Sequence, residues 1–494
     1  MKRESEHDNI HSKHHIGWNL DNSYAALPPK LYVFQKATRH ASPSLVIFNR
    51  ELAQRLGLDP DALEQGEGVD VFSGNTTPEG AMPLAQAYAG HQFGSFTMLG
   101  DGRALLLGEQ IAPDGMRFDI QLKGSGVTPF SRRGDGKAAL GPMLREYIIS
   151  EAMHALDIPT TRSLAVIKTG EPVYRETVLP GAVLTRVAAS HIRVGTFEYA
   201  YGIDEPSTLK ALADYTIRRH FPELAEVDNP FLELLSAVTE RQARLIAQWM
   251  LVGFIHGVMN TDNMAISGET IDYGPCAFMD AYKLDTVFSS IDAHGRYAYG
   301  NQPVIAQWNL ARFAETLLPL IASDQDTAVQ LAEEVIRKFS NIYETNRLDG
   351  MRRKLGLLDA QPDDKSLADD LLTMMQNYEL DFTNTFRSLT DRQTIQLEAS
   401  DLQSWIQRWL TRRDSQLTSK EHIIGTMLKA NPVVIPRNHQ VEAALEAAVK
   451  NDDYMPFHRL LSVLQRPFDI TPENVAFREP PPPTQQKYRT FCGT

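Results

Sequence analysis

The sequence of 494 residues contains only two cysteines, Cys276 and Cys492. Two thiols are too few for the disulfide framework that holds small secreted domains together. The sequence also lacks a run of about 18 apolar residues, the length that a membrane-spanning helix needs, and its polar start lacks the apolar core of a signal peptide. These absences predict a cytoplasmic protein that does not enter a membrane.

Basic residues are scarce relative to acidic ones. The chain has 49 Lys and Arg against 62 Asp and Glu, which gives a formal net charge of −13. A dedicated nucleic-acid binder needs a basic stripe, and anionic lipid attracts basic clusters. We therefore expect neither nucleic acid nor membrane as a partner, although a local basic pocket for a nucleotide is compatible with this balance.

Strand-like patterns fill the first part of the chain after a polar start. The alternation of Phe118, Ile120 and Leu122 is typical of a strand, and Leu144–Leu156 has apolar residues at helical spacing. Further strands are expected at Ser163–Lys168, Val173–Thr177 and Ala182–Val187. One helix is expected near Leu52–Leu58.

Helical patterns dominate the second part, beginning with Phe231–Phe254 and continuing over 305–345, 365–410 and 440–465. The expected organisation is a disordered N-terminus at 1–15, a β-rich lobe with a wrapping segment at 16–200, a helical catalytic lobe at 201–350, a helical extension at 351–478 and a Pro-rich tail at 479–494. The predicted fold class is therefore α+β with two lobes, and nucleotide sites commonly lie at such a junction.

Two polar features lie in the strand-rich part. Gly100 and Gly102 form a turn before Arg103, where the backbone could approach phosphates and the guanidinium could pair with them; a plain hairpin turn fits the same residues. Lys123 ends a strand and Glu146 lies on the following helix, an order that resembles the Lys–Glu pair of protein kinases. The alternative is an exposed lysine and a solvated glutamate.

A loop after the long helix carries the strongest signal. Asp262 and Asn263 are adjacent, and Asp272 opens an Asp-Tyr-Gly segment further on. Protein kinases use a catalytic-loop Asp and Asn followed by Asp-Phe-Gly. Asn263 and Asp272 offer oxygen ligands for Mg²⁺, and Asp262 is free to act as a base. Arg186 and Arg193 could neutralise a triphosphate, but the sequence pattern alone does not separate them from surface arginines.

Longer motifs accompany these residues in a fixed order. They are Gly90-His91-Gln92-Phe93-Gly94, Leu99-Gly100-Asp101-Gly102-Arg103-Ala104, Gln121-Leu122-Lys123-Gly124-Ser125-Gly126, Ser131-Arg132-Arg133-Gly134-Asp135-Gly136, Arg145-Glu146-Tyr147, Leu184-Thr185-Arg186-Val187, His191-Ile192-Arg193, and His256-Gly257 through Asp272-Tyr273-Gly274-Pro275. In these motifs the chain, from about residue 18 to its end, resembles the selenoprotein O family of protein adenylyltransferases.

The resemblance implies a kinase-like fold that binds ATP in a flipped orientation. AMP would then pass to Ser, Thr or Tyr hydroxyls of other proteins, with release of pyrophosphate, and UTP is a further donor in some members. The residues implied to bind ATP are Gly100, Gly102, Arg103, Lys123, Asp135, Gly136, Arg186, Arg193 and Asp272. The resemblance also implies Asn263 and Asp272 as ligands of Mg²⁺ or Mn²⁺, Asp262 as the proton acceptor and Glu146 as the support of Lys123.

Two alternatives to AMP transfer stay open at this point. An ordinary phosphotransferase could use the same residues, because phosphoryl and nucleotidyl transfer both depend on positioning and charge neutralisation. A catalytically silent module that binds ATP and senses redox state is the other. The resemblance further suggests a regulatory disulfide from the tail cysteine, Cys492, for which Cys276 is the only possible partner; the alternative is a buried Cys276 and an exposed Cys492.

Overall fold

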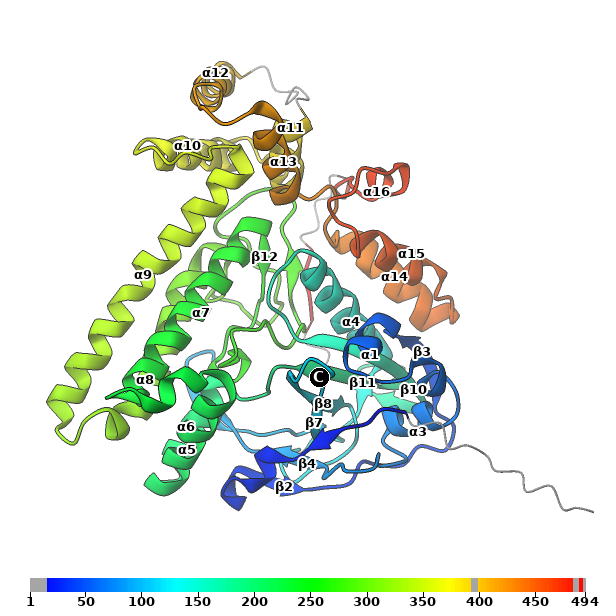
Figure 1. The fold of residues 1–494 in the computed structure, drawn as a ribbon. Helices are drawn as coiled ribbons and strands as arrows, with labels where there is room; N and C mark the ends of the chain where they lie inside the picture. The colour runs from blue at the N-terminus through cyan, green and yellow to red at the C-terminus, as the bar shows by residue number, and fades with distance from the viewer. Residues whose placement is uncertain (1–15, 392–398, 483–487, 492–494) are drawn as a thin grey trace, which may run out of the picture.

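The computed structural model describes residues 16–391, 399–482 and 488–491 (Figure 1). The strands are β1 Leu20–Asp21, β2 Tyr32–Phe34, β3 Ser44–Phe48, β4 Leu84–Gln86, β5 Ala89–Gln92, β6 Ser95–Met98, β7 Ala104–Ile111, β8 Arg117–Lys123, β9 Ala138–Ala139, β10 Arg162–Tyr174, β11 Val178–Ala188, β12 Phe254–Ile255 and β13 Ala277–Phe278. The helices are α1 Arg50–Arg55, α2 Pro60–Leu63, α3 Glu67–Ser73, α4 Leu140–Ala155, α5 Val194–Gly202, α6 Pro206–His220, α7 Pro230–Val252, α8 Gln302–Ile321, α9 Gln325–Leu355, α10 Asp364–Asn377, α11 Phe382–Asp391, α12 Ser400–Asp414, α13 Lys420–Ala430, α14 Asn438–Asn451, α15 Met455–Leu464 and α16 Pro472–Ala476. The fold is thus α+β, and the segment 1–15, expected to be disordered, lies outside the described residues.

Nine strands in the described part of the chain form one antiparallel sheet, with the order β2-β4-β7-β8-β11-β10-β3, β1 beside β7 and β9 beside β11. Its two faces are covered by different layers. Val166 and Leu184 pack in the large hydrophobic core with α4, whereas their neighbours Ile167 and Val183 pack in a smaller core with α1, α2 and α3. Because successive strand residues point to opposite faces, this alternation places α4 on one face of the sheet and the short helices on the other.

One predicted strand boundary is wrong. The sequence predicted separate strands at Ser163–Lys168 and Val173–Thr177, but β10 runs without interruption from Arg162 to Tyr174. A register shift between Lys168 and Pro172 and a left-handed Gly170 (φ +75°) form a bulge inside the strand. A bulge of this kind bends a strand without ending it.

The predicted long helix is confirmed as α7, which packs against α8 and α9. It ends two residues before the predicted Phe254, because Gly253 adopts the left-handed conformation (φ +72°) that commonly closes a helix. Helices α10, α11 and α13 contact α9, and α14 and α15 pack on α4 (Figure 1). None of the helices in the described ranges combines the length and the hydropathy needed to cross a membrane.

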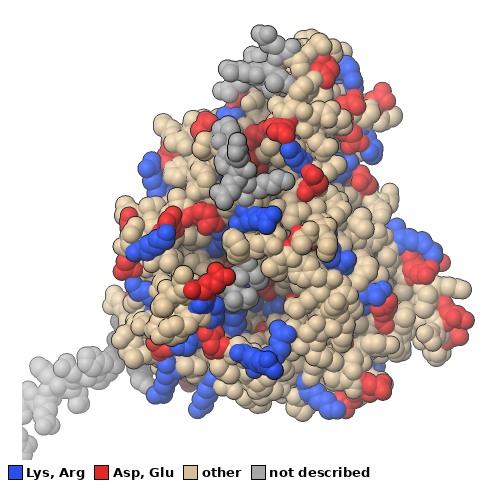
Figure 2. Space-filling view, turned by 180° about the vertical axis from the view of Figure 1, so that it is seen from behind, with Lys and Arg blue, Asp and Glu red and all other residues tan. Residues whose placement is uncertain are grey.

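The surface carries both signs of charge. On the face shown in Figure 2, Lys and Arg side chains gather in the lower half of the molecule, with Asp and Glu side chains interspersed among them.

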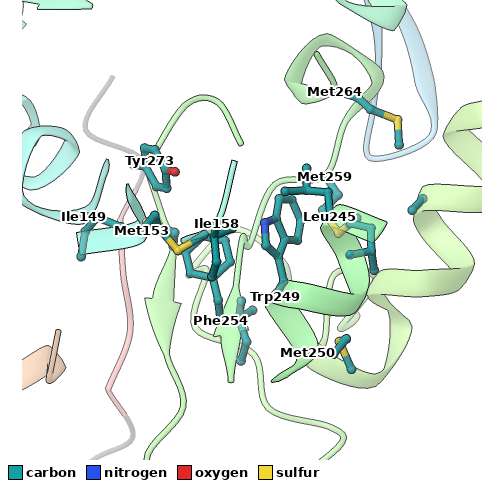
Figure 3. Packing of buried hydrophobic residues seen from close by; sticks show 14 of the residues in the cluster. Ile149, Met153, Ile158, Leu245, Trp249, Met250, Phe254, Met259, Met264 and Tyr273 are labelled. Atoms are coloured by element: carbon teal, nitrogen blue, oxygen red, sulfur yellow. The ribbon is translucent and has the colours of Figure 1, made fainter. Parts of the chain in front are cut away.

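A cluster of buried rings joins α7 to the loop that contains Asp262 and Asp272. The rings of Trp249 and Phe254 meet edge to face at 5.3 Å between centroids, and Phe254 meets Tyr273 in the same way at 6.1 Å. Figure 3 shows Met153 of α4 beside these rings. Because the cluster joins α4 to the segments before and after the loop, it holds the loop in place relative to the sheet.

The turn at Gly257 gives a test of this packing. Gly257 has φ +80°, and a Cβ there would lie 2.6 Å from the main-chain oxygen of Pro275. We expect Gly257→Ala to lower the free energy of unfolding, measured by thermal denaturation, by more than the cost of backbone strain alone, which is about 1–2 kcal/mol. The matched control is Gly115→Ala, since Gly115 has φ +82° but open space around it. Equal shifts in the two variants would show that the contact with Pro275 does not constrain the loop.

Candidate active site

One face of β8 is polar although it is buried. Asp119, Gln121 and Lys123 alternate with Phe118, Ile120 and Leu122, which pack in the smaller core. The two-residue period of a strand therefore directs the three polar side chains to the opposite face, toward α4. This face is where the candidate site is assembled.

Lys123 contacts two carboxylates. Its Nζ atom donates to Glu146 Oε2 at 2.6 Å and to Asp272 Oδ1 at 2.5 Å. Glu146 is buried on α4, and Lys123 itself is only 8% exposed. The structure thus brings together the strand lysine, the helix glutamate and the aspartate of the Asp-Tyr-Gly segment, while their roles toward ATP stay predictions.

Asp272 also forms ion pairs with both predicted arginines. Arg186 Nη1 donates to Asp272 Oδ1 at 2.7 Å and lies 3.2 Å from Glu146 Oε1. Arg193 Nη1 donates to Asp272 Oδ2 at 3.3 Å. Both arginines are buried, so neither is the surface arginine that sequence alone had to allow.

The carboxylate of Asp272 is therefore strongly stabilised as an anion. Burial acts to raise its pKa, but the cations of Lys123, Arg186 and Arg193 together hold the pKa well below its usual range. The backbone of Asp272 is left-handed, with φ +64°. Non-glycine residues rarely adopt this conformation, which costs about 1–3 kcal/mol and tends to occur at functional sites.

Asp262 lies beside this cationic cluster in a buried position. Its main-chain oxygen accepts from Arg193 Nη1 at 2.9 Å, whereas its Oδ1 atom accepts no hydrogen bond from the described residues. Burial raises the pKa of Asp262 to about 6, with Arg193 opposing this shift. A buried carboxylate with an uncommitted oxygen is suited to accept a proton from a substrate.

The glycine turn before β7 packs on a neighbouring loop. A Cβ at Gly100 would lie 2.4 Å from the ring of Phe130, and one at Gly102 would lie 3.0 Å from the Phe130 main-chain oxygen. The main-chain oxygen of Arg103 accepts from Gly124 N at 2.7 Å. The structure thus explains the glycines by close packing, and the contact of this turn with phosphates stays a prediction.

Asp135 and Gly136 contact other partners than the cationic cluster. Exposed Asp135 pairs with Arg175 through both guanidinium nitrogens, at 2.8 and 3.1 Å, and this hydrogen bonding lowers its pKa. Gly136 is left-handed, and a Cβ there would overlap the backbone of Gly126. Sequence similarity is thus the only support for an ATP contact of Asp135 and Gly136.

The metal-binding role of Asn263 and Asp272 stays a prediction. Among the described residues, no three His, Cys, Asp or Glu side chains converge as a metal site of their own. Asn263 is half-buried in the short 3₁₀ turn Thr261–Asn263, where its Nδ2 atom donates to Val258 O at 3.0 Å. An amide oxygen and one carboxylate fit Mg²⁺ or Mn²⁺ that arrives with a nucleotide, because Mg²⁺ is typically bound by one or two carboxylates together with substrate phosphates.

Cys276 is buried, and burial raises the pKa of its thiol to about 12. Cys492 lies outside the described residues. The hydroxyl of Thr490 donates to the main-chain oxygen of Pro275 at 2.7 Å, so the tail passes beside Cys276. The regulatory disulfide stays a prediction that thiol labelling with and without reductant would test.

Two residues without a predicted role, Gln121 and Asp101, contact the predicted arginines. Gln121 accepts from Arg186 at 2.6 Å and donates to Asp101 at 3.2 Å. Asp101 is buried 3.9 Å from Arg193, and burial raises its pKa to about 6. Both residues lie inside motifs quoted for the resemblance, but only the fold brings them to Arg186 and Arg193.

A second group fastens the hairpin β5–β6 to the loop before Asp262. Glu198 of α5 bonds to His91 Nδ1 and to the hydroxyl of Thr261, both at 2.6 Å. The amide of His91 also donates to Thr261 Oγ1 at 2.7 Å. On the same strand, a Cβ at Gly90 would lie 2.1 Å from Asp262 Oδ1, so only glycine fits against this carboxylate.

Most of the chain is similar to known proteins. The family model described as protein adenylyltransferase SelO matches residues 16–465. Proteins named protein nucleotidyltransferase YdiU are 59% identical over 481 residues in Bacillus cereus (97% of this chain and 99% of the relative), 60% over 481 in Brevibacillus brevis (97% and 98%) and 60% over 483 in Halalkalibacterium halodurans (97% and 98%).

The protein is therefore a nucleotidyltransferase that acts on proteins. Within that class, the chain belongs to the SelO family of protein adenylyltransferases, which confirms the family suggested by its motifs.

The ion pair between Lys123 and Glu146 can be tested against a neighbouring ion pair. Glu146→Gln removes the charge that holds Lys123 and Arg186, and we expect weaker ATP binding together with a loss of stability of about 3 kcal/mol. Glu151→Gln is the control, because Glu151 is equally buried on α4 but pairs with Arg162. It should lower stability while leaving ATP affinity, measured by calorimetry, unchanged. Equal ATP affinity in both variants would contradict the role of Glu146.

The contact of Gly90 with Asp262 predicts a second effect. We expect Gly90→Ala to reduce the transfer rate by about 100-fold or more, because a misplaced catalytic group costs that much, with ATP affinity retained. Gly141→Ala serves as the control, since a Cβ there meets only Val449 at an ordinary 3.5 Å. Wild-type turnover in Gly90→Ala would show that Asp262 does not need this close approach.

Proposed function

We propose that this protein transfers AMP from ATP to Ser, Thr or Tyr hydroxyls of other proteins and releases pyrophosphate. The observation that carries the proposal is the convergence of Lys123, Arg186 and Arg193 on Asp272, beside the buried carboxylate of Asp262. We further propose a two-lobed, kinase-like organisation, with the sheet-containing part at 16–200, the catalytic helices at 201–350 and a helical extension at 351–478.

The cationic cluster is suited to bind a triphosphate. Three cations that are held in place before the substrate arrives lose little freedom on binding and act where water is excluded. In the structure they pair with Asp272 and Glu146. The phosphates would take over part of this pairing, while Asn263 and Asp272 would hold Mg²⁺ or Mn²⁺, whose charge would neutralise phosphate oxygens.

The proposed step forms one bond and breaks one. The acceptor oxygen attacks the α-phosphorus of ATP, and the bond from that phosphorus to the oxygen shared with the β-phosphate breaks. Pyrophosphate leaves with that electron pair, and Asp262 takes the proton of the acceptor hydroxyl. The product is a phosphodiester between AMP and the protein side chain.

The same residues could support attack on the γ-phosphorus, which would make the protein a kinase that releases ADP. The family assignment favours the α-phosphorus. A silent ATP-binding module is less compatible with the site, since the buried Oδ1 atom of Asp262 accepts no hydrogen bond from the described residues.

Label transfer tests the reaction class. The purified protein is incubated with Mg²⁺ or Mn²⁺ and with ATP labelled at the α- or the γ-phosphate, or with α-labelled UTP, in the presence of acceptor proteins. With ATP, we expect label on protein from the α-phosphate and none from the γ-phosphate, and no label after addition of a chelator; label from α-labelled UTP would add UMP as a transferred group. Label from the γ-phosphate alone would establish a kinase.

Substitution of single carboxylates assigns their roles. We expect Asp262→Asn to slow transfer by at least about 100-fold, the lower range for loss of a general base, with ATP affinity nearly unchanged. Asp272→Ala should abolish metal-dependent turnover. Asp364→Asn, a change at a buried carboxylate of α10 that pairs with Arg352, controls for loss of a buried charge elsewhere. If Asp262→Asn loses ATP binding instead of rate, Asp262 is not the base.

A further inference from the structure

The hairpin β5–β6 has an open edge. Its two strands form a sheet of their own, and within the described residues no other strand pairs with β6. The strands pair in the register Ala89↔Met98, Gly90↔Thr97, His91↔Phe96 and Gln92↔Ser95. An unpaired edge exposes a row of main-chain donors and acceptors that another chain can use.

The register identifies the groups at this edge. Leu99 N donates to Tyr88 O at 2.9 Å, so these two residues form a hydrogen-bonded pair of the antiparallel ladder. Hydrogen-bonded and non-hydrogen-bonded pairs alternate, which directs the main-chain groups of Phe96 and Met98 away from β5. The amide of His91, opposite Phe96, likewise points outward from the hairpin and donates to Thr261.

Apolar side chains lie exposed along the same edge. Phe93, Phe96 and Met98 are 38%, 48% and 44% exposed, and Tyr201 of α5 is 50% exposed. A Cβ at Gly202 would lie 3.2 Å from Met98 Cε and 3.7 Å from Phe96 Cζ, so these side chains gather over the end of α5. We call Phe96, Met98 and Tyr201 the hairpin patch, since the ring of Phe93 packs on Tyr297 instead. A grouped set of exposed apolar residues commonly marks an interaction surface.

The other strand of the hairpin lies against the catalytic residues. Gly90 touches Asp262, His91 is bonded to Thr261, and Phe93 N donates to Asn260 Oδ1 at 3.1 Å. A strand added to β6 would lie about 10 Å from β5, two strand spacings away. A chain held there is close enough for a neighbouring residue to reach the site.

We propose that the free edge of β6 docks an extended segment of the acceptor protein by strand addition, with an apolar side chain of that segment on the hairpin patch. The inference rests on the proposed function, because it needs a protein acceptor whose hydroxyl must reach Asp262. Strand addition takes its affinity from main-chain hydrogen bonds and its selectivity from alternate side chains. It therefore suits an enzyme that modifies extended segments of different sequence.

The experiment uses reduced, unfolded casein as the acceptor, since it presents many extended segments with hydroxyl side chains. Hydrogen–deuterium exchange is measured over residues 95–99 with and without casein. We expect slower exchange in this segment with casein. Unchanged exchange overturns the docking, whether or not label is transferred. Slow exchange that depends on the concentration of the protein alone also overturns it, because a second copy would then cover the edge.

Two substitutions of Met98 separate the contribution of the main-chain edge to casein binding from the contribution of the side chain. Met98→Pro removes an outward amide, and Met98→Ala keeps that amide but shortens the side chain. We expect the KM for casein, followed with α-labelled ATP, to rise about 10-fold or more in Met98→Pro and less in Met98→Ala, since each tenfold change corresponds to about 1.4 kcal/mol. The KM for ATP should not change in either variant.

Met116→Ala is the control, because Met116 is an equally exposed methionine in the turn between β7 and β8. An unchanged KM for casein in Met98→Pro overturns the docking while leaving AMP transfer intact. Conversely, absence of α-label on casein with the wild-type protein, together with slowed exchange at residues 95–99, would contradict the proposed reaction and retain the docking.

Discussion

The ionic cluster around Asp272 is the interaction on which the site depends. The Asp272 carboxylate forms ion pairs with three side chains: Lys123 of β8, Arg186 of β11 and Arg193 at the start of α5. Burying so many charges is costly unless they are paired and hydrogen-bonded. Removal of Asp272 would take a carboxylate partner from all three cations, so the cluster ties the sheet, the start of α5 and the Asp-Tyr-Gly segment together.

A second set of contacts ties Asp262 to the hairpin β5–β6. Glu198 links His91 to Thr261, and Gly90 fits against the Asp262 carboxylate. The hairpin thus connects the buried Asp262 carboxylate to an exposed strand edge. A protein that modifies other proteins needs such a connection, because a small donor and a large acceptor must meet at one point.

The sequence alone predicted the α+β class, the helix α7 and the Lys–Glu–Asp order, because periodicity and motif spacing are local signals. It missed the bulge in β10, which joins two predicted strands into one, since Gly170 reads equally well as a turn. The contacts of Gln121, Asp101 and Glu198 could not be predicted, because they join segments that lie far apart in the chain. The packing of Gly90 on Asp262 likewise follows only from the fold.

In the proposed reaction the site presents the α-phosphorus of ATP to Asp262. The most direct measurement is an experimental structure with Mn²⁺ and an ATP analogue in which a methylene group replaces the oxygen between the α- and β-phosphorus. We expect the α-phosphorus to be the phosphorus nearest to the carboxylate of Asp262. A structure in which the γ-phosphorus occupies that place would contradict it and indicate phosphoryl transfer.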